Sequence, residues 1–203
     1  MNYEKAKKMN EWNITTDKRK IMIIGTGGIG SFLIPLLDKT GLYKITAFDP
    51  DIVETKNLTY QNYEQDEVED KKVYAMKNRY KSVVKAEPYL VLTQRQIEGY
   101  DLVICCADNL DVRRLLYRSS CQWLDLRAQA RNGALISYKT PKNMFDTVLT
   151  GPDGSFSCQG DSWEGKREGI HFTHVAIAGM AAEWMQRWFV DNDDVCDYKV
   201  VNI

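Results

Sequence analysis

A glycine cluster near the start of the chain has the residue types and spacing of a phosphate-binding turn. It reads Gly25-Thr26-Gly27-Gly28-Ile29-Gly30 and directly follows the apolar run 21–24. Glycines allow a tight turn, and they let backbone N–H groups approach a phosphate at the N-terminus of the following helix. We therefore expect the four glycines to bind a nucleotide. The turn by itself does not indicate which reaction follows.

An acidic residue stands where a nucleotide-binding fold uses one. Asp49 ends the apolar run 44–48. It follows the glycine turn by roughly 20 residues, the spacing from which an acidic side chain hydrogen-bonds a ribose. The alternative is an ordinary surface acid at the end of a strand.

The cysteines show no pattern of a disulfide framework or a zinc site. They stand at positions 105, 106, 121, 158 and 196 and form no Cys-x-x-Cys pair. Reduced thiols in a cytoplasmic protein are the simplest interpretation. Cys105 and Cys106 are expected on opposite faces of a buried strand, as packing residues.

Apolar runs alternate with helical patterns in the order typical of a parallel α/β sheet. We expect strands over 21–24, 44–48, 89–92, 102–106, 123–126 and 134–138, and an edge strand over 198–201. Helices are expected over 29–39, 71–84, 111–120 and 172–189. The last helix is apolar nearly all round, which indicates burial in the core or against a second subunit. The glycine-rich stretch 151–169 is predicted to be a mobile loop.

Length and charge limit the classes of protein that fit. The 203 residues predict one domain over 1–203, and 27 Lys and Arg balance 28 Asp and Glu. That balance argues against a nucleic-acid-binding protein, which carries a basic stripe. A hydrophobic content of 44% argues against disorder. No stretch has the character of a leader or a membrane span, so no membrane partner is expected.

From Asp49 onward the chain resembles the ThiF/MoeB family of ubiquitin-activating-type adenylyltransferases. That family reads Asp-x-Asp-x-Val-Glu-x-x-Asn-Leu-x-Arg-Gln. Residues 49–61 here read Asp-Pro-Asp-Ile-Val-Glu-Thr-Lys-Asn-Leu-Thr-Tyr-Gln. The resemblance continues at Lys72, at Cys106-Ala107-Asp108-Asn109 and at Arg113, and it covers roughly residues 21–116.

The resemblance implies a Rossmann-like, mostly parallel sheet flanked by helices, with an ATP-binding core over 14–120 and a buried C-terminal helix. It implies ATP and Mg²⁺ as cofactors and Asp108 as the metal ligand, because a carboxylate at a strand end suits Mg²⁺. The catalytic residues that it implies are Lys72, Asp108 and Cys158. Besides the glycines and Asp49, the implied nucleotide contacts are Asp51, Asn57, Gln61, Lys72, Asn109 and Arg113.

The implied activity is adenylation of the C-terminal carboxylate of a small ubiquitin-like or sulfur-carrier protein ending in diglycine, by a homodimer. Several residues keep a simpler interpretation beside the implied one. Lys72 is otherwise a solvated lysine at a helix start, and Asn57 a turn former. Cys158 is either a nucleophile, its thiolate favoured by Lys166 and Arg167, or a remnant of a zinc site, or idle.

The chain also departs from the family pattern. Tyr60 stands in place of the family's arginine, and Lys56, Arg113 and Arg131 are candidates to supply the missing charge. The zinc-binding Cys-x-x-Cys pairs of many relatives are absent, so no zinc is expected, and His171 and His174 have no evident third ligand. Two alternatives therefore remain, an NAD(P)-dependent oxidoreductase and a non-catalytic nucleotide-binding scaffold.

Overall fold

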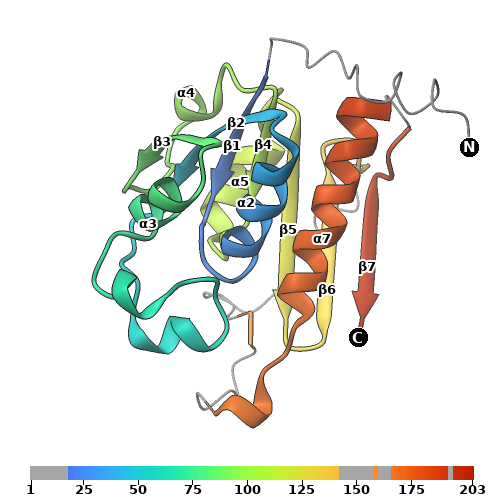
Figure 1. Cartoon of the computed structure of the whole chain (residues 1–203). Coiled ribbons are helices and arrows are strands. Elements are labelled where there is room, and N and C mark those ends of the chain that lie inside the picture. The colour runs from blue at the N-terminus through green and yellow to red at the C-terminus, as the bar shows by residue number, and fades with distance from the viewer. Residues whose placement is uncertain (1–17, 142–157, 160–165, 192–193) are drawn as a thin grey trace, which may run out of the picture.

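The computed structural model describes residues 18–141, 158–159, 166–191 and 194–203. They form one sheet in the order β3-β2-β1-β4-β5-β6-β7 (Figure 1). The strands are β1 (Arg19–Ile24), β2 (Tyr43–Phe48), β3 (Val83–Glu87), β4 (Leu102–Cys105), β5 (Trp123–Gln129), β6 (Asn132–Ser137) and β7 (Tyr198–Asn202). Neighbouring strands are parallel from β3 to β5, whereas β6 and β7 are antiparallel. The predicted fold class, a mostly parallel Rossmann-like α/β sheet, is confirmed.

Helices cover both faces of this sheet. They are α2 (Gly28–Thr40), α3 (Lys72–Arg79), α4 (Gln94–Ile97), α5 (Leu110–Tyr117) and α7 (Thr173–Gln186). In Figure 1, α2 and α7 lie side by side in front of the strands. Short helical turns complete the described chain: η1 (Thr55–Thr59), η2 (Gln65–Glu67), η3 (Arg167–Gly169) and η4 (Arg187–Asp191).

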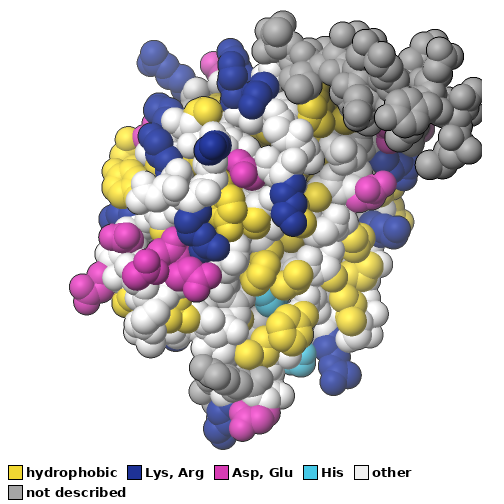
Figure 2. Space-filling model, in the orientation of Figure 1, with side chains coloured by type: hydrophobic (Ala, Val, Ile, Leu, Met, Phe, Trp, Pro, Cys, Tyr) yellow, Lys and Arg dark blue, Asp and Glu magenta, His cyan; other side chains and the backbone are white. Residues whose placement is uncertain are grey.

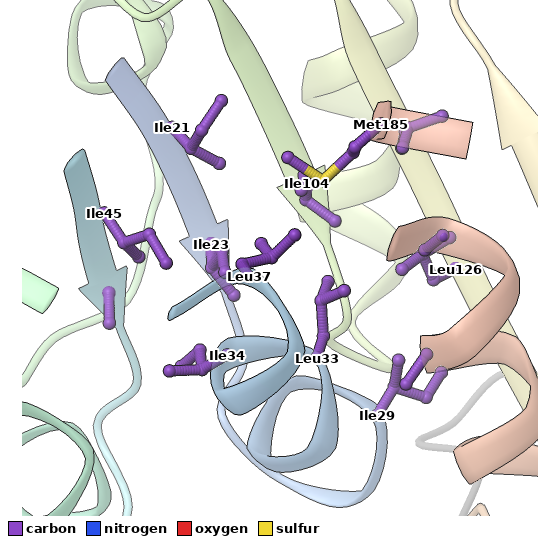
Figure 3. Packing of buried hydrophobic residues seen from close by; sticks show 14 of the residues in the cluster. Ile21, Ile23, Ile29, Leu33, Ile34, Leu37, Ile45, Ile104, Leu126 and Met185 are labelled. Atoms are coloured by element: carbon purple, nitrogen blue, oxygen red, sulfur yellow. The ribbon is translucent and has the colours of Figure 1, made fainter. Parts of the chain in front are cut away.

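The alternation of side chains along the central strands creates two cores. Ile21 and Ile23 of β1 pack in the core under α2 and α7, whereas Met22 and Ile24 pack in the core under α4 and α5. Both pairs are buried because a parallel sheet with helices on both faces hides each face of its strands. Figure 3 shows the first core, with residues from α2, from the strands and from α7 pointing toward one another.

The close packing of α7 depends on one glycine of the sheet. A Cβ atom at Gly133 of β6 would lie 2.7 Å from Cγ1 of Ile177 on α7. Ile177, Ala181 and Met185 are fully buried on this side of the helix. The predicted burial of the C-terminal helix in the core is therefore confirmed for this face.

Two of the predicted element boundaries were wrong. The helix expected over 71–84 ends at Arg79, and the strand expected over 89–92 is β3 at Val83–Glu87. Val83, which was assigned to the helix, is the first residue of β3 and is buried there. Helix α7 ends at Gln186 and η4 continues it to Asp191, close to the predicted 189.

The chain leaves β1 and β4, neighbours in the sheet, in opposite directions. From β1 it runs through α2 to β2, and from β4 it runs through α5 to β5 on the other side. Ligands of open α/β sheets bind in the crevice outside the carboxyl ends of the strands at such a point. No helix of the described residues is long and apolar enough to cross a membrane. Most of the loop predicted over 151–169 lies outside the described residues.

Candidate functional site

A cavity of about 1100 Å³ opens at the carboxyl ends of β1, β2 and β4. Its walls contain every predicted catalytic or nucleotide-binding residue except Gly30 and Arg113. The predicted residues that line it are Gly25, Gly27, Gly28, Asp49, Asp51, Asn57, Gln61, Lys72, Asp108, Asn109 and Cys158. The fold thus brings together side chains that are far apart in the sequence.

The glycine turn forms the floor of the cavity. Gly25 has a φ of +90°, and a Cβ atom there would lie 2.9 Å from the backbone N of Ala107. A Cβ atom at Gly30 would lie 2.0 Å from the carbonyl oxygen of Gly25. These two glycines therefore let the turn close on itself. Gly27 instead lines the cavity, and a Cβ atom there would lie 3.8 Å from Nε2 of Gln61.

Asp49 holds the glycine turn in place. Its Oδ2 accepts hydrogen bonds from the backbone N of Thr26 at 2.7 Å and from the Thr26 hydroxyl at 3.1 Å. Its Oδ1 accepts a hydrogen bond from the backbone N of Asp51 at 2.9 Å. The carboxylate is almost fully buried and is compensated by these three donors. The surface-acid interpretation is wrong, and the ribose contact remains a prediction.

Two adjacent lysines line the cavity where α3 begins. Nζ of Lys72 donates to Oδ2 of Asp51 at 3.1 Å, and Nζ of Lys71 donates to the carbonyl oxygen of Pro50 at 2.6 Å. The Lys72 side chain is only 8% exposed. Its partner Asp51 is 64% exposed, so the ammonium is the buried charge of this pair. The solvated-lysine interpretation of Lys72 is therefore wrong.

Asn57 and Gln61 approach the cavity from η1 and the residues after it. Asn57 is buried, and its Oδ1 accepts a hydrogen bond from the backbone N of Glu54 at 2.9 Å. Asn57 therefore forms the turn and lines the cavity at once. Oε1 of Gln61 is buried without a hydrogen-bond partner among the described residues. A buried polar atom without a partner is costly, so the Gln61 amide is suited to a ligand.

Asp108 and Asn109 follow β4 at the far wall of the cavity. Oδ1 of Asn109 accepts hydrogen bonds from the backbone N of Asp111 at 2.9 Å and of Val112 at 3.2 Å. This is an N-cap of α5, and it fixes the start of the helix next to Asp108. Asp108 itself is partly buried and lines the cavity.

Arg113 lies one turn into α5 but does not line the cavity. Its side chain is 6% exposed and forms an ion pair with the fully buried Asp125 of β5, Nε to Oδ1 at 3.2 Å. The other oxygen of Asp125 accepts hydrogen bonds from Arg127 at 2.6 Å and from the Tyr117 hydroxyl at 2.6 Å. These four side chains, called here the Asp125 cluster, join α5 to β5.

Cys158 covers the start of α2. A Cβ atom at Gly28 would lie 2.9 Å from its Sγ, and its carbonyl oxygen accepts a hydrogen bond from the backbone N of Ala130 at 3.1 Å. Burial and the nearby Asp108 charge raise the pKa of the Cys158 thiol to about 11. The pKa is thus raised, not lowered as the expected effect of Lys166 and Arg167 requires, and the side chain of Arg167 lies outside the described residues.

The next residue anchors this short segment to the chain before α7. Nε2 of Gln159 donates to the His171 carbonyl oxygen at 3.0 Å, and the His171 backbone N donates to Oε1 of Gln159 at 2.8 Å. His174 is buried, and burial lowers its pKa. Among the described residues, no group of three or more His, Cys, Asp or Glu is placed to hold a metal ion.

One end of the cavity is apolar, which the sequence analysis did not predict. Ile52, Tyr89, Leu90 and Val91 line this end, and the first three are 42%, 53% and 46% exposed. Residues 89–92 were assigned to a strand because they are apolar and short, a pattern that strands share with such a wall. The cavity thus has a charged end near the glycine turn and Asp108, and an apolar end beyond β2 and β3.

Comparison with known proteins matches this chain to the family model of the ThiF family over residues 14–197. The chain is 32% identical over 115 residues to adenylyltransferase and sulfurtransferase UBA4 of Candida albicans, which covers 52% of this chain and 26% of that protein. It is 22% identical over 181 residues to ubiquitin-like modifier-activating enzyme 5 of Mus musculus, covering 77% of this chain and 44% of that protein. The chain spans less than half the length of these relatives.

Solved structures share the fold at low identity. The crystal structure of E. coli MccB superposes with a TM-score of 0.70 at 15% identity, covering 91% of this chain and 59% of that chain. The structure of PaaA gives a TM-score of 0.66 at 17% identity, covering 91% of this chain and 61% of that chain. At these identities the likeness shows a common architecture.

Proposed function

The chain belongs to the ThiF family, and we propose that it is an ATP-dependent adenylyltransferase that activates the C-terminal carboxylate of a small ubiquitin-like or sulfur-carrier protein. One observation carries the proposal, a cavity whose two ends match the two ends of a nucleotide. The glycine turn and Lys72 suit phosphates, whereas Tyr89 and Leu90 suit an aromatic base. Adenylyltransferase relatives support this choice, and so does the structure of MccB with ATP.

The glycine turn would hold the phosphates, whereas the buried Oε1 of Gln61 is a hydrogen-bond acceptor and suits a donor group of the nucleotide. The first backbone N–H groups of α2 lack partners within the helix, and the helix dipole favours negative charge at this end. Gly27 leaves this approach open, and the buried Oε1 of Gln61 lies beside it. Asp49 is suited to a ribose hydroxyl, because a carboxylate accepts more hydrogen bonds than the three that it makes with the turn.

Mg²⁺ fits the far wall of the cavity. It is usually bound through one or two carboxylates together with substrate phosphates, and Asp108 supplies such a carboxylate at the end of β4. When bound, the ion would neutralise phosphate charge. Asn109 keeps Asp108 at the start of α5 through its cap, and Lys72 faces the same cavity with a second positive charge.

In the reaction, a carboxylate oxygen of the carrier attacks the α-phosphorus, and a new C–O–P bond forms. The bond from the α-phosphorus to the bridging oxygen breaks, and pyrophosphate leaves with that electron pair. The residues of this chain orient the two substrates and stabilise the charge that moves to the leaving group. The nucleophile of this step is the carboxylate of the carrier, so the step itself needs no thiol.

The homodimer expected from the resemblance stays a prediction. Hydrophobic side chains are exposed on the face of the molecule that α2 and α7 form (Figure 2). Leu36 of α2 and Phe172, just before α7, are 37% and 67% exposed. A second copy that covered this face would bury them. A light-scattering mass near the 23.4 kDa of one chain at micromolar concentration would contradict it.

The test of the function is ATP–pyrophosphate exchange with a diglycine carrier. We expect calorimetry to show binding of ATP with Mg²⁺ and none of NAD⁺, and exchange to depend on the carrier. Tight binding of NAD⁺ without binding of ATP would favour the oxidoreductase. Binding of ATP without exchange in the presence of the cognate carrier would favour the scaffold.

A further inference from the structure

The cationic side chains that line the cavity, within the part of the chain that the structure describes, are Lys56, Lys71 and Lys72. Arg113 and Arg131, the other candidates to replace the arginine missing at position 60, do not line it. Arg113 is held by the buried Asp125, and Arg131 lies between β5 and β6. A triphosphate brings several negative charges into the cavity, so the way in which each lysine is held decides what it can neutralise.

Lys71 and Lys72 are committed to fixed partners. Lys72 is nearly buried beside Asp51, and Nζ of Lys71 is within 2.6 Å of the Pro50 carbonyl oxygen. The backbone beside them is also paired, since the Lys72 N–H donates to the Asp51 carbonyl oxygen at 3.0 Å. Both lysines therefore belong to the structure of this wall and can move little.

Lys56 is held differently. Its side chain is 68% exposed and forms an ion pair with Glu54, which is itself 48% exposed. The hydrogen bond to Glu54 and the Glu54 charge raise the pKa of Lys56, which keeps the ammonium charged. Exposed pairs of this kind contribute little, so the ammonium can leave Glu54 at small cost. A triphosphate carries more negative charge than the single Glu54 carboxylate, so it can compete with Glu54 for the ammonium.

Tyr60, which stands in place of the family's arginine, has no positive charge to offer a phosphate, and its ring makes a packing contact instead. It lies edge-on to the ring of His174 on α7, with the ring centroids 6.4 Å apart. The residue at position 60 therefore packs toward α7. Lys56 lies one helical turn before it, on the same short element η1 that carries the buried Asn57.

We infer that Lys56 is the phosphate-binding cation of this cavity in place of the missing arginine, and that Glu54 holds it in reserve until a nucleotide enters. The inference rests on the proposed function and names the residue that completes its site. Binding would exchange one ion pair for another, from Lys56–Glu54 to Lys56–phosphate. Glu54 then acts on the nucleotide only through Lys56, as a positioning residue that competes with the phosphate.

This arrangement is tested by a double-mutant cycle on the whole chain. The variants are Lys56→Ala, Glu54→Gln and the two combined, with Lys77→Ala as the control. Lys77 is an exposed lysine of α3 that does not line the cavity. Glutamine keeps an oxygen for local hydrogen bonds and removes the charge. The measurements are the dissociation constants of ATP·Mg²⁺ and of adenosine by calorimetry.

We expect Lys56→Ala to weaken ATP binding about 10-fold, the loss of one charged hydrogen bond, and adenosine binding less than about 2-fold. Glu54→Gln should tighten ATP binding about 2-fold to 3-fold, because Lys56 is released from the competing carboxylate. In the Lys56→Ala background, Glu54→Gln should have no effect, since the two residues act through one interaction. Lys77→Ala should leave both constants unchanged.

The inference would be overturned by Lys56→Ala binding ATP as the wild type does. Equal weakening of ATP and adenosine would also overturn it, because that pattern indicates a damaged cavity. The inference would likewise be overturned if Glu54→Gln tightened ATP binding in the Lys56→Ala background as well. A wild-type chain that binds no ATP·Mg²⁺ would instead overturn the proposed function itself, so the two failures are distinguishable.

Discussion

Two groups of charged side chains in this molecule use the same chemistry in different surroundings. In the Asp125 cluster, the carboxylate is fully buried and two arginines and a tyrosine surround it. At the mouth of the cavity, Glu54 and Asp51 are half-exposed or more and each holds one lysine. The first group cannot change partners without leaving a buried charge uncompensated, whereas the exposed Lys56–Glu54 pair of the second group can. The cluster is therefore structural, and the cavity mouth is able to bind.

The largest effect that we expect comes from the cavity wall. Asp108→Ala should lower ATP–pyrophosphate exchange by about 10³ or more, since in the proposed function this carboxylate would hold a metal ion worth several kcal/mol at the reacting phosphate. The circular dichroism spectrum should not change, because the side chain lines a cavity rather than a core. Asp111→Ala, which removes an exposed carboxylate from α5, the helix that begins just after Asp108, is the matched control. Full exchange in Asp108→Ala would contradict the assignment.

The Asp125 cluster should respond in stability. Asp125→Ala leaves two largely buried arginines without their carboxylate, and breaking such a buried pair costs about 3–5 kcal/mol. Urea unfolding should show this loss as a lower midpoint. The comparison is Asp194→Ala, which breaks the exposed pair with Lys139 and should cost less than about 1 kcal/mol. Similar losses for both variants would remove the distinction between buried and exposed charges.

The sequence predicted the residues at the charged end of the cavity but not those of the Asp125 cluster. The glycine turn and Asp49 were found because they stand at the ends of strands, which the parallel sheet brings together. Lys72 and Asp108 were found through the resemblance to the ThiF/MoeB family. The Asp125 cluster was not found, because Arg113 was matched to the nucleotide site by motif. Its true partner lies on β5, and a pairing between elements leaves no local signal in the sequence.

The wrong boundaries predicted for α3 and β3 also have a physical reason. Val83 and Val84 continue the apolar spacing of the helix before them, so periodicity alone extends that helix to residue 84. Two β-branched residues in succession favour a strand, and the strand β3 begins there. The same error hid the apolar end of the cavity. With the helix extended to residue 84, the next apolar residues, Tyr89 and Leu90, were assigned to the strand, although they line the cavity.

Cys158 provides a smaller test of burial at the cavity. With a pKa of about 11, its thiolate fraction near pH 8 is about 10²-fold lower than that of an ordinary thiol. Alkylation should therefore modify the exposed Cys196 much faster, and the rate at Cys158 should keep rising toward pH 11. Mass spectrometry of the peptides gives both rates. Rapid labelling of Cys158 at neutral pH would return it to the candidates for a nucleophile.

The smallest effect is expected where the cavity and α7 meet, at Tyr60. Tyr60→Arg removes the edge-on ring contact with His174, which should lower stability by about 1 kcal/mol. In the otherwise unchanged chain, exchange should change by no more than a few-fold, because Lys56 already supplies a cation there.

The same substitution should matter more when Lys56 is absent. In the Lys56→Ala background, Tyr60→Arg should recover most of the lost affinity for ATP, since a guanidinium then restores the charge from the neighbouring turn. Calorimetry on the four variants separates the outcomes. A large gain from Tyr60→Arg alone would show that the natural cavity lacks a cation and that Lys56 does not provide one. Recovery confined to the Lys56→Ala background would show that Lys56, from its exposed ion pair with Glu54, supplies the charge that the family takes from an arginine. The buried arginines of the Asp125 cluster cannot supply it, because they stay paired with their carboxylate.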